Sequence, residues 1–339
     1  MILKIVGFIV IFVVLLSMTQ TVLLGSILLG LNNQCTNMIK NIIISIMPLI
    51  YTYCFDSVIH YNAQYNATDK VDIIVSNHTT TIDFAVYLSL LRQFDDRDVY
   101  FLLKRDVIFI PGGGFNLCVG PDIKLHRKLE DDKENIINCV KKIKSGIIIL
   151  MPEGTRFTPE KQILAQQYSK ENNYPIFKNT LFPKMKGLWI IANILYNNNK
   201  LGKIIDFSTI VENFHREKAY MKDILMKPLG RTFSVIRTYA IPVKYLNDYD
   251  KFKKWFLRLW EKKDNILENI NTYNYTKLKP ELTSYNYMII IVMVTLFIYL
   301  ATHSNMLFLP ASFFASYIIT IICYFTPLEI KNNPNNVKI

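Results

Sequence analysis

The chain has a long stretch without charged residues at each end. No Lys, Arg, Asp or Glu occurs between Ile5 and Met38, or between Leu282 and Leu328. Residues 5–31 form an apolar run that exceeds the ~20 residues a helix needs to cross a bilayer. A cleaved signal peptide is the alternative, but its apolar region is about 7–15 residues long. The length of the run therefore favours a retained membrane anchor.

The C-terminal charge-free stretch contains two apolar blocks, at 287–301 and 307–325, separated by a short polar segment. This pattern predicts a helical hairpin in or across the bilayer, with aromatic residues at its margins. A shorter apolar stretch at 42–55 predicts a re-entrant or interfacial helix, or the second arm of a hairpin. Too few basic residues flank these segments to predict their topology.

These boundaries divide the chain into four parts. We expect membrane anchor segments over 1–55, a folded domain over 56–281, a C-terminal membrane hairpin over 282–328 and a polar tail over 329–339. We therefore expect an integral membrane protein.

The net charge is +12, and the middle of the chain carries nearly all of the charged residues. A basic domain between apolar ends is attracted to an anionic membrane surface or to phosphorylated substrates. Nucleic acid is the competing partner, but the basic residues are scattered and form no recognisable nucleic-acid module. The five cysteines include no close pair, so neither a disulfide framework nor a zinc site is predicted. We therefore expect lipid, and no nucleic acid, as the partner.

The middle of the chain alternates between strand-like and helix-like patterns. Four short runs rich in β-branched residues predict strands at 71–76, 146–151, 203–210 and 235–243. Helical patterns lie between and after them, at 81–92, 128–145, 184–196 and 249–271. This interleaving predicts an α/β domain with a mixed central sheet flanked by helices.

A histidine and an aspartate follow the first predicted strand. His78 and Asp83 are five positions apart, which on a regular helix would place their side chains about 140° apart. They converge if His78 lies in the turn and Asp83 in the first helical turn, with Thr79 to Thr81 as candidate N-caps. Asp83 would then orient His78 as a general base. A surface histidine beside an unrelated aspartate is the alternative.

A second polar block follows the predicted strand at 146–151. The sequence Glu153-Gly154-Thr155-Arg156 offers a guanidinium, a hydroxyl and glycine-exposed backbone, which together suit a phosphate. The alternative is an ordinary turn with a surface arginine.

Taken together and in this order, the two blocks resemble the glycerolipid acyltransferase family, which includes 1-acylglycerol-3-phosphate (lysophosphatidate) acyltransferases. Residues 115–127 resemble the family's intervening block, and 181–187 and 205–210 resemble later ones. The charged stretch at 255–264 is similar to the C-terminal extension of the eukaryotic subgroup.

The resemblance implies direct acyl transfer from acyl-CoA to the free hydroxyl of a lysophospholipid, with His78 as base and Asp83 orienting it. It implies acceptor binding by a set of residues around them: Arg127, Glu153, Gly154, Thr155, Arg156, Lys104 and Lys184. Lys184 stands where the family usually has Arg. No metal or cofactor is expected, and acyl-CoA is a co-substrate. The expected membrane is the endoplasmic reticulum or another internal membrane.

Three functions fit these residues. The first acceptor is 1-acyl-sn-glycerol 3-phosphate, which gives phosphatidate. The second is another lysophospholipid, such as lysophosphatidylinositol or lysocardiolipin, in a remodelling reaction. The third function is a catalytically silent membrane scaffold, against which the intact His78, Asp83 and 153–156 block argue.

Overall fold

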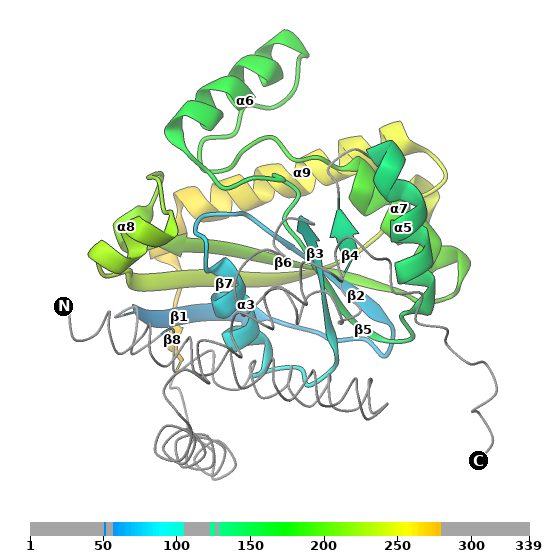
Figure 1. Cartoon of the computed structure of the whole chain (residues 1–339), viewed down its shortest axis with the longest axis horizontal. Helices are drawn as coiled ribbons and strands as arrows, with labels where there is room; N and C mark the ends of the chain where they lie inside the picture. The colour runs from blue at the N-terminus through cyan, green and yellow to red at the C-terminus, as the bar shows by residue number, and fades with distance from the viewer. Residues whose placement is uncertain (1–50, 52–56, 105–122, 126–128, 279–339) are drawn as a thin grey trace, which may run out of the picture. The chain divides into compact units, whose positions relative to one another are not determined.

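The computed structural model describes residues 51, 57–104, 123–125 and 129–278, which form an α/β domain around one sheet (Figure 1). The strands are β1 (Ser57–Gln64), β2 (Val71–Ser76), β3 (Val99–Lys104), β4 (Ile123–Leu125), β5 (Gly146–Leu150), β6 (Leu201–Val211), β7 (Gly230–Ala240) and β8 (Thr276–Lys277). The helices are α3 (Asp83–Leu91), α5 (Leu129–Lys142), α6 (Pro159–Glu171), α7 (Lys186–Asn197), α8 (Met221–Met226) and α9 (Tyr249–Glu268).

The eight strands lie in the order β4-β3-β5-β2-β6-β7-β1-β8. The five strands from β4 to β6 run parallel to one another, whereas β7 is antiparallel to β6 and β8 is antiparallel to β1. The predicted mixed sheet in an α/β domain is therefore confirmed. Because parallel strands end at the same edge of a sheet, the loops that follow β2 and β5 lie side by side.

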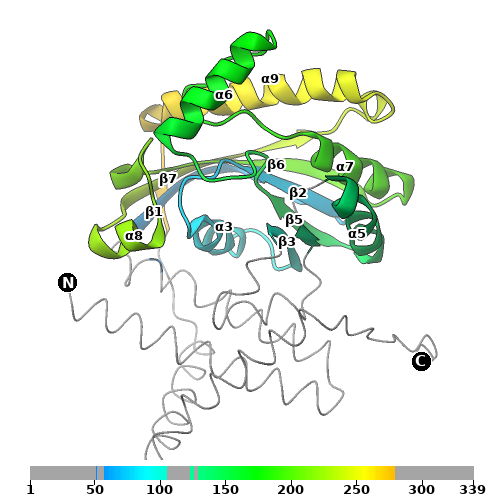
Figure 2. The same ribbon diagram turned by 45° about the horizontal axis from the view of Figure 1, so that its top comes forward.

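Both faces of the central strands are covered. Val71, Ile73 and Val75 of β2 belong to a core shared with residues of α5, α7 and α9. On the opposite face, the ring of Tyr87 in α3 packs edge-on against Phe207 of β6, with centroids 5.6 Å apart. Figure 2 shows α9 and α3 on opposite sides of the sheet. Burial on both faces explains why β5 is apolar throughout its length and why every residue of β2 is buried.

The four expected strands overlap β2, β5, β6 and β7, and the four expected helices overlap α3, α5, α7 and α9. Strands β1, β3, β4 and β8 and helices α6 and α8 were not predicted. Helix α6 is polar on most sides, and Ser169 is its one buried residue, so it has no apolar periodicity to reveal it.

The predicted caps of α3 are wrong. The N-cap position is Ile82, and no side chain caps the helix. Thr79 and Thr80 donate their hydroxyl groups to the carboxylate of Asp83 instead. The Thr80 hydroxyl also accepts the N–H of Ile82 at 3.2 Å, ahead of the first helical residue.

The predicted membrane segments at the two ends of the chain lie outside the described residues, apart from position 51. Among the helices that the structure describes, none combines the length and apolar character needed to cross a bilayer.

Candidate active site

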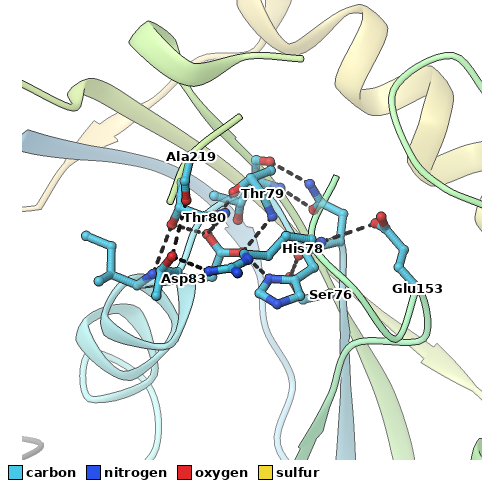
Figure 3. A network of polar contacts seen from close by, with 12 residues as sticks. Ser76, His78, Thr79, Thr80, Asp83, Glu153 and Ala219 are labelled. Carbon is cyan, nitrogen blue, oxygen red and sulfur yellow. Dashed lines mark hydrogen bonds and ion pairs between the residues drawn. The ribbon is translucent and has the colours of Figure 1, made fainter. Parts of the chain in front are cut away.

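The turn between β2 and α3 brings His78 and Asp83 together. Nδ1 of His78 lies 2.9 Å from Oδ2 of Asp83, and Figure 3 shows the imidazole turned toward this carboxylate. The Asp83 side chain is fully buried, whereas 22% of the His78 side chain is exposed. Within the described part of the chain, the other ring nitrogen, Nε2, makes no hydrogen bond. The imidazole is thus oriented through Nδ1.

The carboxylate of Asp83 is held by four further hydrogen bonds. The backbone N–H groups of Thr79 and Thr80 donate to it at 2.7 Å and 2.8 Å. Their hydroxyl groups donate at 2.7 Å and 2.6 Å. A buried carboxylate is costly unless it is hydrogen-bonded, and these donors offset that cost. They also fix the direction of the oxygen that meets His78.

The loop after β5 reaches the same turn through Glu153. Oε1 of this buried carboxyl group accepts the backbone N–H of His78 at 3.1 Å, and Oε2 accepts that of Leu181 at 3.2 Å. The carbonyl of His78 accepts the N–H of Phe157 at 2.8 Å. Figure 3 shows Glu153 approaching His78 from the side opposite Asp83. The loop after β5 is therefore hydrogen-bonded to both the N–H and the carbonyl group of His78.

Burial raises the pKa of Glu153 to about 8, and the negative charge of Asp83 acts in the same direction. The N–H groups of His78 and Leu181 and the positive charge of Lys263 oppose this rise in pKa. Burial therefore outweighs the two backbone hydrogen bonds and the charge of Lys263, and it favours the protonated form of the Glu153 carboxyl group.

Gly154 allows the loop to turn tightly beside Lys184. Its φ of +66° lies in the left-handed region that other residues rarely adopt. A Cβ atom at this position would lie 3.4 Å from Cδ of Lys184 and 3.7 Å from its Nζ. The N–H of Lys184 also donates to the carbonyl of Pro152 at 2.7 Å. The structure therefore brings Lys184 to the loop, with its side chain exposed.

Arg156 lies between the His78 turn and the segment before α8. Its Nη1 atom donates to the hydroxyl of Thr81, and its guanidinium carbon lies 4.7 Å from the centroid of the Tyr220 ring. Thr81 is itself bonded to the carbonyl of Ala219 through its N–H at 3.3 Å and its hydroxyl at 3.2 Å. A half-buried guanidinium bonded to Thr81, in the same turn as His78, suits an anionic group of a substrate.

Thr155 and the start of α6 complete this loop. The hydroxyl of Thr155 accepts a hydrogen bond from Nζ of Lys161 at 2.6 Å. Thr158 caps α6 by accepting the N–H of Lys161 at 3.3 Å, and Pro159 occupies the first turn. The cap fixes where the loop ends, and so restricts the position of Arg156.

Of the two remaining residues predicted to bind substrate, one lies farther along the sheet and the other lies outside the described residues. Lys104 is the exposed last residue of β3, two strands from β2, at the carboxyl edge where His78 also lies. Arg127 lies outside the described residues. In the ranges that the structure describes, no three His, Cys, Asp or Glu side chains are grouped to hold a metal ion.

The sequence did not reveal several groups of this site. The ring of Tyr220, the carbonyl of Ala219 and the amine of Lys161 all contact predicted site residues or their neighbours. None belongs to a recognisable motif. Thr79 and Thr80 stood in the predicted turn, but their role as donors to Asp83 required the three-dimensional arrangement.

Residues 57–195 match the profile of the Acyltransferase family. A protein of Arabidopsis thaliana named "Probable 1-acyl-sn-glycerol-3-phosphate acyltransferase 5" is 29% identical over 124 residues, which is 35% of this chain and 33% of that protein. Lysocardiolipin acyltransferase 1 of Gallus gallus is 26% identical over 202 residues, 58% of this chain and 52% of its own length. The chain thus matches between a third and about half of the length of these relatives.

The fold is similar to the crystal structure of the 1-acyl-sn-glycerophosphate (LPA) acyltransferase PlsC from Thermotoga maritima. The TM-score is 0.50 at 15% identity, over 78% of this chain and 96% of that one. The region that matches the Acyltransferase profile begins at β1 and ends in α7. It contains both the His78 turn and the Glu153 loop. Residues 57–195 of this domain thus belong to the Acyltransferase family.

Proposed function

We propose that this chain transfers a fatty acyl group from acyl-CoA to the free hydroxyl of a lysophospholipid. The observation that carries the proposal is the contact of 2.9 Å between Nδ1 of His78 and Oδ2 of Asp83, which leaves Nε2 for the substrate. The family's activity and the names of the relatives support the same reaction class. The favoured acceptor is 1-acyl-sn-glycerol 3-phosphate, and its product is phosphatidate.

His78 acts as the general base of this reaction. Nε2 removes the proton of the acceptor hydroxyl while that oxygen attacks the thioester carbonyl of acyl-CoA. The tetrahedral intermediate collapses with cleavage of the carbon–sulfur bond. The thiolate of CoA then takes up the proton from His78, which restores the neutral imidazole. Asp83 stabilises the transient imidazolium and keeps Nδ1 protonated.

The acceptor phosphate binds to the basic groups around the imidazole. Arg156 is held by Thr81 and Tyr220, and Lys184 packs over Gly154. Lys104 and Arg127 extend this basic surface in our proposal. A charge-assisted contact from a guanidinium gives stronger and more directional binding of phosphate than a neutral donor.

The apolar ends of the chain anchor the domain at an internal membrane, such as the endoplasmic reticulum. Both the acceptor and the acyl chain of the donor are concentrated there. The net charge of +12 favours an anionic surface.

Remodelling of another lysophospholipid is the second candidate function. Lysocardiolipin acyltransferase 1 is among the relatives, and its match covers 58% of this chain. Both candidates use the same catalytic pair and differ in the headgroup that the basic residues accept.

An acyl-transfer assay with a panel of acceptors tests the proposal. Membranes containing the chain receive labelled acyl-CoA with lysophosphatidate, lysophosphatidylinositol or monolysocardiolipin, and membranes with His78→Ala provide the blank. We expect the highest kcat/KM with lysophosphatidate. A preference for another acceptor would favour the remodelling reaction. No transfer above the blank to any acceptor would favour the silent scaffold.

A further inference from the structure

A third segment borders the candidate active site, beside the two that carry the sequence blocks. Strand β6 lies next to β2 in the sheet and runs parallel to it, so the chain leaves β6 at the same edge as the His78 turn. The segment after β6, residues 212–220, leads into α8 and belongs to none of the blocks recognised in the sequence. Its contacts with the site therefore indicate what it contributes.

The last two residues of this segment are fixed between the His78 turn and α8. The carbonyl of Ala219 accepts the N–H of Thr81 at 3.3 Å and its hydroxyl at 3.2 Å. The N–H of Tyr220 donates to Oδ2 of Asp223 at 3.0 Å. The carbonyl of Tyr220 accepts the N–H groups of Asp223 and Ile224 at 3.0 Å and 3.1 Å. The backbone that carries the Tyr220 ring is thus held from both sides.

Arg216 anchors the middle of the segment. Its φ of +57° lies in the left-handed region that such a residue rarely adopts. Its Nε donates to Oδ1 of Asn179 at 3.0 Å, and its Nη2 pairs with Glu268 of α9 at 2.8 Å. Asn179 lies two residues before Leu181, whose N–H donates to Glu153. The segment after β6 is therefore attached to the same framework that holds the Glu153 loop.

The ring of Tyr220 holds the guanidinium of Arg156 by its face. The guanidinium carbon lies 4.7 Å from the ring centroid, within the range of a cation–π contact. An aromatic face attracts the guanidinium plane but accepts none of its five N–H groups. Among the described residues, the hydroxyl of Thr81 is the one hydrogen-bond acceptor of Arg156. The ring thus orients the guanidinium and leaves most of its donors for a ligand.

Arg156 differs in this respect from other arginines of the domain. Arg97, Arg216 and Arg231 each pair with a carboxylate, at distances of 2.5–2.8 Å. Within the ranges that the structure describes, Arg156 has Thr81 and Tyr220 as partners and no carboxylate. A carboxylate would compete with a substrate phosphate for the same N–H groups and would offset the positive charge. A neutral ring fixes the side chain without either effect.

We propose that Tyr220 is a positioning residue for the acceptor phosphate, whose ring holds the plane of the Arg156 guanidinium so that its remaining N–H groups reach the phosphate together. This inference rests on the proposed function of the site. Tyr220 acts through Arg156, and its hydroxyl group has no part in this role.

Three substitutions of Tyr220 separate the ring from the hydroxyl group. Tyr220→Phe keeps the ring, whereas Tyr220→Leu removes it. Tyr220→Gln also removes the ring and replaces Tyr220→Leu in the test if the latter does not fold, as thermal unfolding in detergent would show. Tyr196→Leu, at an exposed position of α7, is the matched control.

Two properties of the full chain in detergent are measured for each variant. The first is the Kd of sn-glycerol 3-phosphate, a soluble phosphate headgroup, by isothermal titration with glycerol as the uncharged control. The second is the pair of KM values for lysophosphatidate and acyl-CoA. In Tyr220→Leu we expect the Kd and the KM of lysophosphatidate to rise about three- to tenfold, as for one lost cation–π contact. The kcat and the KM of acyl-CoA should stay within about twofold, and Tyr220→Phe and Tyr196→Leu should match the parent within the same limit.

Coupling to Arg156 distinguishes positioning from a purely structural role. In an Arg156→Ala background, Tyr220→Leu should raise neither the Kd nor the KM of lysophosphatidate further, because the guanidinium that the ring positions is absent. A further rise in that background would overturn the proposal. Equal losses in Tyr220→Phe and Tyr220→Leu would also overturn it, as would an equal rise in the KM of acyl-CoA.

Failure of this inference is distinguishable from failure of the proposed function. If the parent binds sn-glycerol 3-phosphate but transfers no acyl group, the proposed function fails, while the Kd values still measure the effect of Tyr220 on the phosphate site. If acyl transfer occurs and neither the Kd nor the KM of lysophosphatidate responds to loss of the ring, the role of Tyr220 is wrong and the proposed function stands.

Discussion

Oε1 of Glu153 accepts the backbone N–H of His78 at 3.1 Å, although 75 residues separate the two in the sequence. This contact connects the loop after β5 to the turn after β2, on neighbouring parallel strands. It gives Glu153 a role in holding the imidazole's backbone, whereas Asp83 holds the ring. The proposed catalytic base is thus fixed through two different carboxyl groups.

Replacing Asp83 with Asn should impair both activity and stability. The amide would turn one NH₂ group toward the donors on Thr79 and Thr80, so at least one buried N–H or O–H would lose its acceptor. The expected cost is about 1–3 kcal/mol in the free energy of unfolding. The rate should fall about 10²-fold or more, because the imidazole loses its orienting carboxylate. Asp96→Asn, whose side chain is 97% exposed, is the control. A parent-like kcat in Asp83→Asn would remove Asp83 from the mechanism.

Arg156→Ala should weaken binding of the acceptor more than that of acyl-CoA. A lost charge-assisted hydrogen bond corresponds to roughly 1.5–3 kcal/mol, so the KM for lysophospholipid should rise about tenfold or more. Steady-state kinetics with each substrate varied in turn measures both constants. Arg258→Ala, at an exposed position of α9, should change neither. An increase confined to the KM of acyl-CoA would assign this loop to the donor.

The raised pKa of Glu153 predicts a pH dependence of stability. In the folded protein Glu153 keeps its proton up to about pH 8, whereas its ordinary pKa is 4.5. Folding therefore takes up a proton between these values, and this group makes stability fall as pH rises through the window. Replacing Glu153 with Gln should remove that contribution. Thermal unfolding in detergent, compared for parent and Glu153→Gln across the window, should show a steeper decline for the parent. Parallel curves would contradict the raised pKa.

Membrane attachment should not depend on the N-terminal apolar run alone. A chain that begins at Asp56 retains the apolar blocks 287–301 and 307–325. We expect it to stay with membranes through a carbonate wash and to need detergent for release. A chain limited to 56–281 is the control and should be released by the wash. A monodisperse aqueous form of the longer chain would contradict the predicted C-terminal hairpin.

The sequence revealed the parts of the fold whose burial produces a simple pattern. Strands β2 and β5 are covered on both faces, so they appear as short runs rich in β-branched residues. Helix α9 shows an apolar period because one face packs against the sheet. Helix α6 and the half-exposed strand β3 lack such patterns, and their formation depends on tertiary contacts.

The candidate site was predictable where the sequence neighbours also interact. His78 and Asp83 are close in sequence, and a strand-to-helix turn brings them together. The partners of Glu153 were not predictable, because Leu181 and Lys263 come from distant segments. Lys263 stands at a core position of the helical period, but a lysine ordinarily indicates an exposed face. Its burial depends on the ion pair with Asp206, which no local sequence pattern predicts.

The rate of acyl transfer by His78→Ala is the most direct test of the central claim. The assay measures labelled product formed from acyl-CoA and lysophosphatidate, with equal amounts of parent and variant in the same membrane preparation. We expect a loss of about 10²–10⁴-fold in kcat, the contribution typical of a general base, with unchanged expression and membrane attachment. A rate within a few-fold of the parent would contradict His78 as the base and, with it, the proposed mechanism.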